Sequence, residues 1–270
     1  IFVAMSIFDV DDNIDNIDVK VPLKCKERRL KEIRGKYEFE NEASLDSDVF
    51  EQYCANLSKV DAFYVPSIPG IPNFGTIREN VVVIFSDQEK TYADKYDDSG
   101  LEKVDVLGEY CNSQHAHVKS KIYIYVNSII KNTQGNGSEI DQLMLAVYIH
   151  ELYHAYFKSN TFIRELEEPL CEFGALFCLE VITAMRIVND HYLNYYKEKV
   201  AGKKELLPEY GMGGYIYDML SDMNIGNLKL LDLYKTKING NQVVFKPGSI
   251  DKLDQNNYYK QICNSLGYVD

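Results

Sequence analysis

The amino-acid sequence predicts an α+β protein in which a small, mostly antiparallel sheet packs on one long helix, followed by a mainly helical C-terminal lobe. Three observations predict this fold class. Short β-branched and aromatic runs lie between residues 64 and 126, an apolar segment with helical spacing covers residues 139–158, and helical patterns fill most of the chain beyond residue 164. We divide the chain into an N-terminal arm and helical segment (1–60), an α+β lobe (61–158) and a helical lobe (159–270).

Length and composition are those of an ordinary globular protein. The 270 residues, 46% of them hydrophobic and 26% charged, are enough to bury a core. A formal charge of -12 disfavours general nucleic-acid binding, because phosphate contacts need a basic surface. No apolar run approaches the ~20 residues of a membrane span, so we expect a soluble chain without one.

The six cysteines, at positions 25, 54, 111, 171, 178 and 263, include no C-x-x-C pair. This scatter is typical of buried thiols rather than of a disulfide framework. It favours the cytoplasm, although a removed leader is an open alternative because the chain begins at Ile1. The oligomeric state stays open.

Two charged stretches precede the sheet. Residues 9–20, DVDDNIDNIDVK, lack the glycine and closing glutamate of a calcium loop, so we interpret them as a surface arm. The basic run at 24–36 is typical of a solvated helix, and a partner site is the alternative. Turn signals then lead into strand patterns, which are VVVIF (81–85), VLGEYC (106–111) and KIYIYV (121–126).

The helix expected over residues 139–158 opens with a capping box from Ser138 to Asp141. We expect its core face to comprise Leu145, Tyr148, Ile149, Leu152, Ala155 and Tyr156. His150 and His154 share one face because positions i and i+4 lie above one another, and we place them on the flank between core and solvent. With Glu151 they form H-E-x-x-H, in which two imidazoles bind zinc and the glutamate acts on the metal's water. Two satisfied surface histidines are the alternative.

A hydrolytic zinc site needs a third protein ligand, and the acids just downstream are Glu165, Glu167, Glu168 and Glu172. Glu168 and Glu172 are four residues apart and share a helix face, so one can bind the metal while the other supports a histidine. Proline is tolerated in the first turn of a helix. We therefore expect the second helix to begin within a few residues of Pro169, with Glu168 at its start.

This combination resembles the zincin metallopeptidases, and within them the gluzincin branch, whose third ligand is a glutamate on the helix after the H-E-x-x-H helix. EEPLCEF (167–173) is similar to that branch's NEGLAEY segment. The resemblance implies that Glu168 is the ligand and Glu172 the partner of a histidine, with Glu172 and then Glu167 as alternative ligands. Pro169 and Cys171 depart from the glycine and alanine of the pattern. The resemblance runs from residue 121 to about residue 177.

The function implied is that of a zinc peptidase acting on a peptide or protein substrate. Zn²⁺ on His150, His154 and Glu168 would activate a water molecule, with Glu151 as general base and then acid. Residues 121–126 would form an edge strand beside the motif helix, to which an extended peptide can add. A non-catalytic binding or regulatory protein that retains a zincin scaffold is the alternative. Cleavage specificity, and endo- versus exopeptidase action, are not predicted.

Other polar candidates are weaker. QHAH (114–117) is interpreted as a solvated loop rather than a pair of metal ligands. His191, Tyr215 and Tyr217 could stabilise an oxyanion, although packing or surface roles are the simpler reading.

Overall fold

The computed structural model describes residues 36–61, 63, 71–92, 104–113, 115, 118–157, 164–203, 213–214, 217, 237–238 and 241–242. Several sequence predictions fall outside these residues, namely the arm at 9–20, nearly all of the basic run at 24–36, Cys25, Cys263, His117 and Tyr215. The helical patterns predicted beyond residue 217 lie outside them as well. The division of the chain into three parts stays a prediction.

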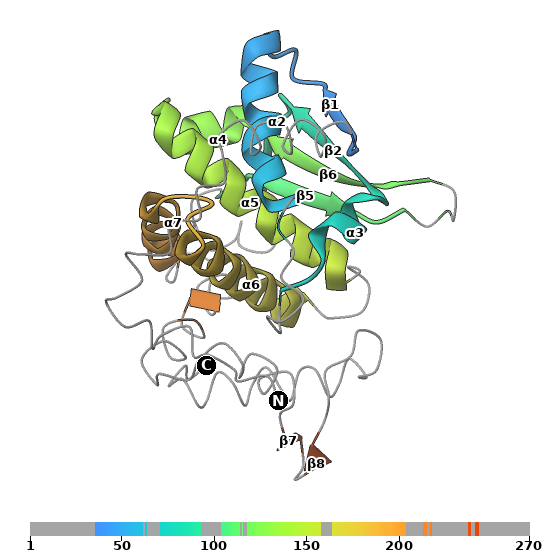
Figure 1. Ribbon diagram of the computed structural model, residues 1–270, viewed down its shortest axis with the longest axis vertical. Coiled ribbons are helices and arrows are strands. Elements are labelled where there is room, and N and C mark those ends of the chain that lie inside the picture. Colours follow the sequence, from blue (N-terminus) through green and yellow to red (C-terminus); the bar gives the residue numbers. More distant parts are fainter. Residues whose placement is uncertain are drawn as a thin grey trace, which may run out of the picture.

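The α+β class is confirmed by a four-stranded sheet packed against helices (Figure 1). Its strands, in the order β1-β2-β6-β5, are β1 (Phe39–Asn41), β2 (Val81–Ser86), β6 (Ser120–Tyr125) and β5 (Gly108–Cys111). β1 pairs with β2 and β2 with β6 in parallel, whereas β5 pairs with β6 antiparallel. The sheet is therefore mixed, and the prediction of a mostly antiparallel sheet is wrong.

The parallel pairing has a physical cause in the connections. A parallel pair needs a crossover that returns the chain to the same end of the sheet. Helices α2 (Ser47–Asp61) and α3 (Phe74–Arg78) provide it between β1 and β2. A separate two-stranded ribbon, β3 (Lys90–Tyr92) with β4 (Val104–Val106), lies between β2 and β5 along the chain.

The strand order also corrects the prediction for residues 121–126. These residues form β6, which lies inside the sheet between β2 and β5 and is not an edge strand. Ile122 and Ile124 are fully buried, as an interior strand requires. The strand at the edge of the sheet next to β6 is β5, and all of its residues are half-buried.

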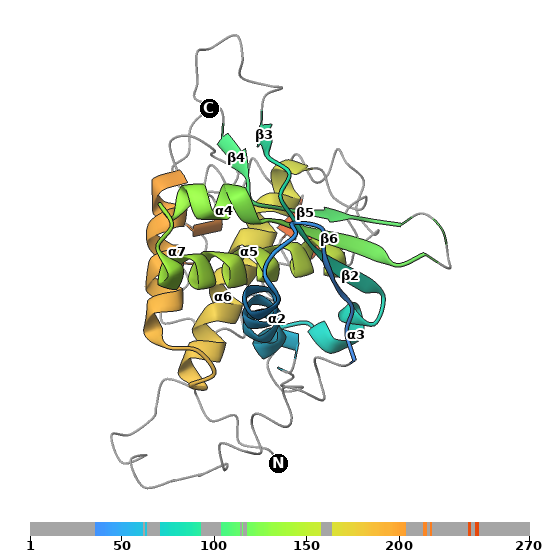
Figure 2. The same cartoon turned by 90° about the horizontal axis from the view of Figure 1, so that it is seen from above.

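Among the described residues four helices follow the sheet, and the second and third of them carry the candidate site. They are α4 (Val126–Asn132), α5 (Gly137–Phe157), α6 (Arg164–Ala184) and α7 (Asp190–Lys203). α5 lies between the sheet and α6, and α7 lies on the side of α5 away from the sheet (Figures 1 and 2). A short pairing of β7 (Lys237–Ile238) with β8 (Asn241–Gln242) completes the described elements.

Helix α5 begins earlier than the predicted capping box. The Ser138 N–H donates to Asn136 Oδ1 at 3.2 Å, and Asn136 Nδ2 donates to Glu139 Oε1 at 2.9 Å. Ser138 Oγ instead accepts from Gln142 Nε2 at 3.1 Å, inside the first turns. The cap is therefore Asn136, because asparagine ahead of Gly137 reaches the orphan N–H groups that Ser138, already helical, does not.

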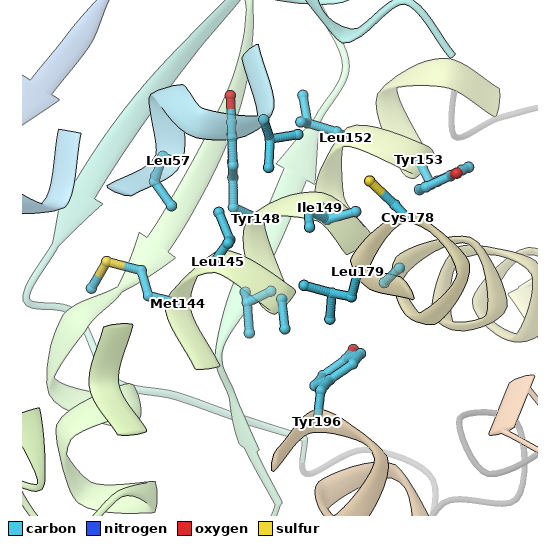
Figure 3. Packing of buried hydrophobic residues seen from close by; sticks show 14 of the residues in the cluster. Leu57, Met144, Leu145, Tyr148, Ile149, Leu152, Tyr153, Cys178, Leu179 and Tyr196 are labelled. Atoms are coloured by element: carbon cyan, nitrogen blue, oxygen red, sulfur yellow. The ribbon is translucent and has the colours of Figure 1, made fainter. Parts of the chain in front are cut away.

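The middle of α5 is buried on every side. Figure 3 shows Met144, Leu145, Tyr148, Ile149, Leu152 and Tyr153 among Leu57 of α2, Cys178 and Leu179 of α6 and Tyr196 of α7. Of the predicted core face only Tyr156 is wrong, since its side chain is 46% exposed. His150 and Glu151, each 6% exposed, lie in the interior and not on a flank. A helix that is apolar all round is enclosed by its neighbours, so its few polar groups need internal partners.

A buried polar cluster holds α5 against α2 and α3. The Tyr148 hydroxyl donates to Asp61 Oδ1 at 2.5 Å, and Arg78 Nε lies 3.4 Å from Asp61 Oδ2. Arg78 also donates to the carbonyls of Val81 and Glu38, at 2.5 and 3.0 Å. Because each charge has a partner, the cluster holds α5 in place next to its H-E-x-x-H segment without leaving an uncompensated ion in the core.

Cys54, Cys171 and Cys178 are buried and Cys111 is half-buried, and none of these four forms a disulfide. This agrees with the expected use of cysteine as a small buried residue. Within the described part of the chain, no helix has the length and apolar character needed to cross a membrane.

Candidate metal site

The candidate site lies where α5 and α6 pack together. α6 begins at Arg164, so Pro169 lies inside the helix rather than in its first turn, and Glu168 is not at the helix start. Close approach of the two helices depends on Gly174, where a Cβ atom would lie 2.6 Å from the Tyr153 ring. This approach brings the acids of α6 within reach of the histidines of α5.

Three donor atoms converge between the helices. His150 Nε2 lies 3.0 Å from His154 Nε2 and 3.2 Å from Glu168 Oε2. His154 Nε2 lies 3.5 Å from the same Glu168 oxygen. We call these three atoms the donor triangle.

The other nitrogen of each ring faces a different carboxylate. His150 Nδ1 lies 3.1 Å from Glu172 Oε2, and His154 Nδ1 lies 2.7 Å from Glu167 Oε1. A carboxylate beside Nδ1 favours the tautomer with its proton on Nδ1, which leaves the lone pair on Nε2. Both rings therefore direct a lone pair into the donor triangle.

The donor triangle fits a metal ion. Tetrahedral zinc at ~2.1 Å from N and O ligands keeps neighbouring ligand atoms about 3.4 Å apart, close to the separations of 3.0, 3.2 and 3.5 Å. Two imidazole lone pairs and a carboxylate oxygen this close repel one another unless a cation or a proton lies among them. The residues can therefore hold a metal ion.

The carboxylates around the two histidines also favour their protonated forms. Burial opposes charge on His150, but its hydrogen bonds to Glu168 and Glu172 raise its pKa to about 9. Burial likewise opposes charge on His154, while Cys171, Glu168 and Glu167 raise its pKa well above 6.5. Burial works against ionisation of Glu168, yet the two histidines hold its pKa well below 4.5. The site thus favours positive charge at its centre.

Glu151 lies beside the triangle, on the side facing strand β5. Its carboxylate and a ring nitrogen of each histidine lie within 4.8 Å of one another. It accepts a hydrogen bond from the main-chain N–H of Tyr110 in β5. Burial raises the pKa of Glu151, and the charges of His154 and His150 oppose that rise. A carboxylate of raised pKa next to a metal-binding group suits proton transfer.

Sequence reasoning missed the full surroundings of His154. Glu167, the last choice for third ligand, faces Nδ1 of His154, and a further group of His154, Glu167 and Cys171 has ligand atoms within 4.8 Å of one another. Cys171 is fully buried, and burial raises the pKa of its thiol to about 12. The i, i+4 spacing of Glu167 and Cys171 was the available signal, although helical periodicity alone does not show which face meets α5.

The remaining candidates lie elsewhere. His191 is exposed on α7, and His115 is exposed in the loop after β5. Tyr217 is buried, with its ring 6.4 Å from that of Phe173 and 4.7 Å from Lys197 Nζ, so it packs on α6. None of these three enters the donor triangle. Glu165 belongs to α6.

Comparisons of the chain with protein-family models, with curated proteins and with solved structures found no match. The gluzincin likeness is therefore carried by the residues of the motif alone. What the site can do has to be argued from its geometry and chemistry.

Proposed function

We propose that this protein is a zinc-dependent hydrolase that cleaves peptide bonds, with Zn²⁺ held by His150, His154 and Glu168. The observation that carries the proposal is the donor triangle, whose three edges are 3.0, 3.2 and 3.5 Å. Two histidines and one glutamate are a ligand set that zinc takes in hydrolytic sites, where the fourth position is left for water. The H-E-x-x-H spacing and the downstream glutamate support the same reading.

The four carboxylates have separate roles in this proposal. Glu168 binds the metal. Glu172 and Glu167 each accept a hydrogen bond from the Nδ1–H of one ligand histidine and so fix the orientation of its ring. Glu151 is outside the donor triangle and serves as the general base. This assignment gives every buried carboxylate of the cluster the metal ion, an N–H donor or a proton to exchange.

Bound zinc would supply a Lewis acid that polarises the substrate carbonyl and brings the pKa of a water molecule toward neutrality. Glu151 would accept a proton from a water molecule beside it and return that proton to the leaving amine, a contribution worth typically ~10²–10⁴-fold. The Tyr110 N–H and the neighbouring histidines hold the Glu151 carboxylate in place for this exchange. Enclosure of His150 and Glu151, each 6% exposed, excludes bulk water from their inner sides.

The substrate we propose is an extended peptide that adds to the outer edge of β5. Among the described residues β5 pairs only with β6, so no described strand lies on its other side, where the Tyr110 N–H donates to Glu151. An edge strand offers main-chain N–H and C=O groups to a partner whatever its side chains are. Contact between β5 and Glu151 brings such a peptide close to the general base.

The test combines metal analysis with a digest of a broad peptide library. We expect about one zinc per chain in the wild type, loss of zinc in His150→Ala and His154→Ala, and retention in His191→Ala, a matched control on the exposed face of α7. Glu151→Gln should keep zinc and lose cleavage by several orders of magnitude. Full zinc occupancy in the two ligand variants would overturn the metal site. Zinc without any cleavage would instead favour a binding or regulatory protein.

A further inference from the structure

Strand β5 contacts the proposed general base through a residue that has no side chain. A Cβ atom at Gly108 would lie 2.6 Å from Val147 Cγ1 and 3.1 Å from both Cγ and Oε1 of Glu151. These distances are shorter than van der Waals contact, so any side chain at position 108 must displace Val147, Glu151 or the strand itself. Glycine lets the strand lie directly against the helix at the position of the base.

The strand pairing directs the main chain of Tyr110 to the same carboxylate. The Tyr125 N–H donates to the Leu107 carbonyl at 3.0 Å, which sets the register of the antiparallel pair. Alternate residues of such a pair turn their N–H and C=O groups to opposite sides. The main-chain N–H and C=O groups of Leu107 point toward β6, so those of Gly108 and Tyr110 point toward the outer edge of the sheet. The Tyr110 N–H accordingly donates to Glu151 rather than to β6.

We propose that β5 positions the Glu151 carboxylate for proton transfer, through the absent side chain at Gly108 and the main-chain N–H of Tyr110. The inference rests on the proposed function, since it takes Glu151 as the base. Proton transfer needs the base within ~2.6–3.2 Å of the proton's heavy atom, and a misplacement of about 1 Å can cost ~100-fold in rate. Gly108 and Tyr110 are positioning residues that act through Glu151.

The first test adds a methyl group at position 108 and separates its contact with Val147 from its contact with Glu151. Gly108→Ala should lower kcat by ~10–100-fold with KM and zinc content unchanged. Because the new methyl group also meets Val147, the double variant with Val147→Ala should restore the melting temperature but not kcat. Val147→Ala alone is the control and should keep kcat within ~3-fold of the wild type. Wild-type kcat in the Gly108→Ala/Val147→Ala variant would overturn the proposal.

The second test removes the N–H of Tyr110. Tyr110→Pro deletes that donor, which faces away from β6, whereas Tyr110→Ala removes the side chain and keeps the N–H. We expect a further ~10-fold loss of kcat in the proline variant relative to the alanine variant, at equal zinc content. Equal kcat in the two variants would show that the N–H has no such role.

Coupling to the base distinguishes positioning from general damage. On a Glu151→Gln background, Gly108→Ala should change the residual rate by less than ~2-fold, because both changes act on one group. If Gly108→Ala lowered the rate by the same factor on both backgrounds, the proposal would be contradicted. Crystal structures of the wild type and the Gly108→Ala/Val147→Ala variant provide a readout other than activity, and we expect a displaced Glu151 carboxylate in the variant. That comparison tests the positioning even if the wild type proves unable to cleave peptides, the outcome that would overturn the proposed function alone.

Discussion

Glu172 Oε2 lies 3.1 Å from Nδ1 of His150, on the side of the ring that faces away from the donor triangle. The Glu172 side chain is 1% exposed, so the carboxylate is stable there only with a partner for its charge. Glu168 lies on the other side of the same ring, 3.2 Å from Nε2. One histidine is thus held between two glutamates that are four residues apart on α6, and their roles can be separated by experiment.

Removal of the two glutamates should have unequal effects on zinc. Glu168→Ala deletes a proposed ligand and should remove most of the metal, whereas Glu172→Ala should weaken binding by the ~10–100-fold typical of a group that orients a ligand histidine. Competition with a zinc-sensitive dye measures both affinities, with Glu180→Ala on the same helix as the control. A larger loss in Glu172→Ala than in Glu168→Ala would make Glu172 the ligand.

Zinc affinity should rise with pH. Zinc needs the unprotonated imidazole, and without metal the pKa of His150 is raised to about 9 by its two glutamate partners against the effect of burial. Binding at pH 7 must therefore displace at least one proton, so affinity should increase by about tenfold per pH unit for each proton released. Titrations at pH 6, 7 and 8 test this, and an affinity that is flat over this range would contradict it.

The raised pKa of His150 also predicts that the stability of the zinc-free protein falls as the pH rises. A histidine whose pKa is higher in the folded state than in the unfolded state stabilises the fold fully below the unfolded value of 6.5. That contribution is lost as the pH rises from 6.5 through about 9. Chemical unfolding in the presence of a chelator should show stability falling across this range, and His150→Ala should flatten the dependence.

Proline in the substrate should block cleavage at particular positions. If a peptide adds to the outer edge of β5, its N–H groups donate to the outward-facing carbonyls of Gly108 and Tyr110, and proline has no N–H to donate. A series of identical peptides with one proline moved along the positions flanking the cleaved bond measures this, with alanine at the same positions as the control. Cleavage that is indifferent to proline throughout would mean that strand addition does not hold the substrate.

Loss of Asp61 should destabilise the fold strongly. Asp61→Ala leaves the guanidinium of Arg78, which is fully buried, without its carboxylate partner, and breaking a buried pair in this way typically costs ~3–5 kcal/mol. Asp87→Ala, on the exposed turn after β2, should change the free energy of unfolding by no more than ~0.5 kcal/mol. Urea unfolding of the two variants decides between a cluster that stabilises the core and one that contributes little.

The elements that sequence reasoning predicted best are those specified by local periodicity. The strand pattern of residues 81–85 became β2, and the segment predicted as a helix over 139–158 became α5 (Gly137–Phe157). A strand of five β-branched and aromatic residues, or a helix of six turns, carries its own repeat in the chain. The pairing partners of β6 carry no such signal, because they depend on which connections cross over, and there the prediction was wrong.

The sequence by itself determined that His150 and His154 share one helix face, with Glu151 between them in the chain. It determined likewise that Glu168 and Glu172 share a face of the next helix. Both follow because residues four apart lie on the same side of any α-helix. Only the tertiary structure decided which ring nitrogen meets which carboxylate and which strand reaches the base. Those contacts depend on how closely α6 approaches α5 at Gly174 and how closely β5 approaches it at Gly108. Such approach is set by packing between segments distant in the chain, which no local repeat encodes.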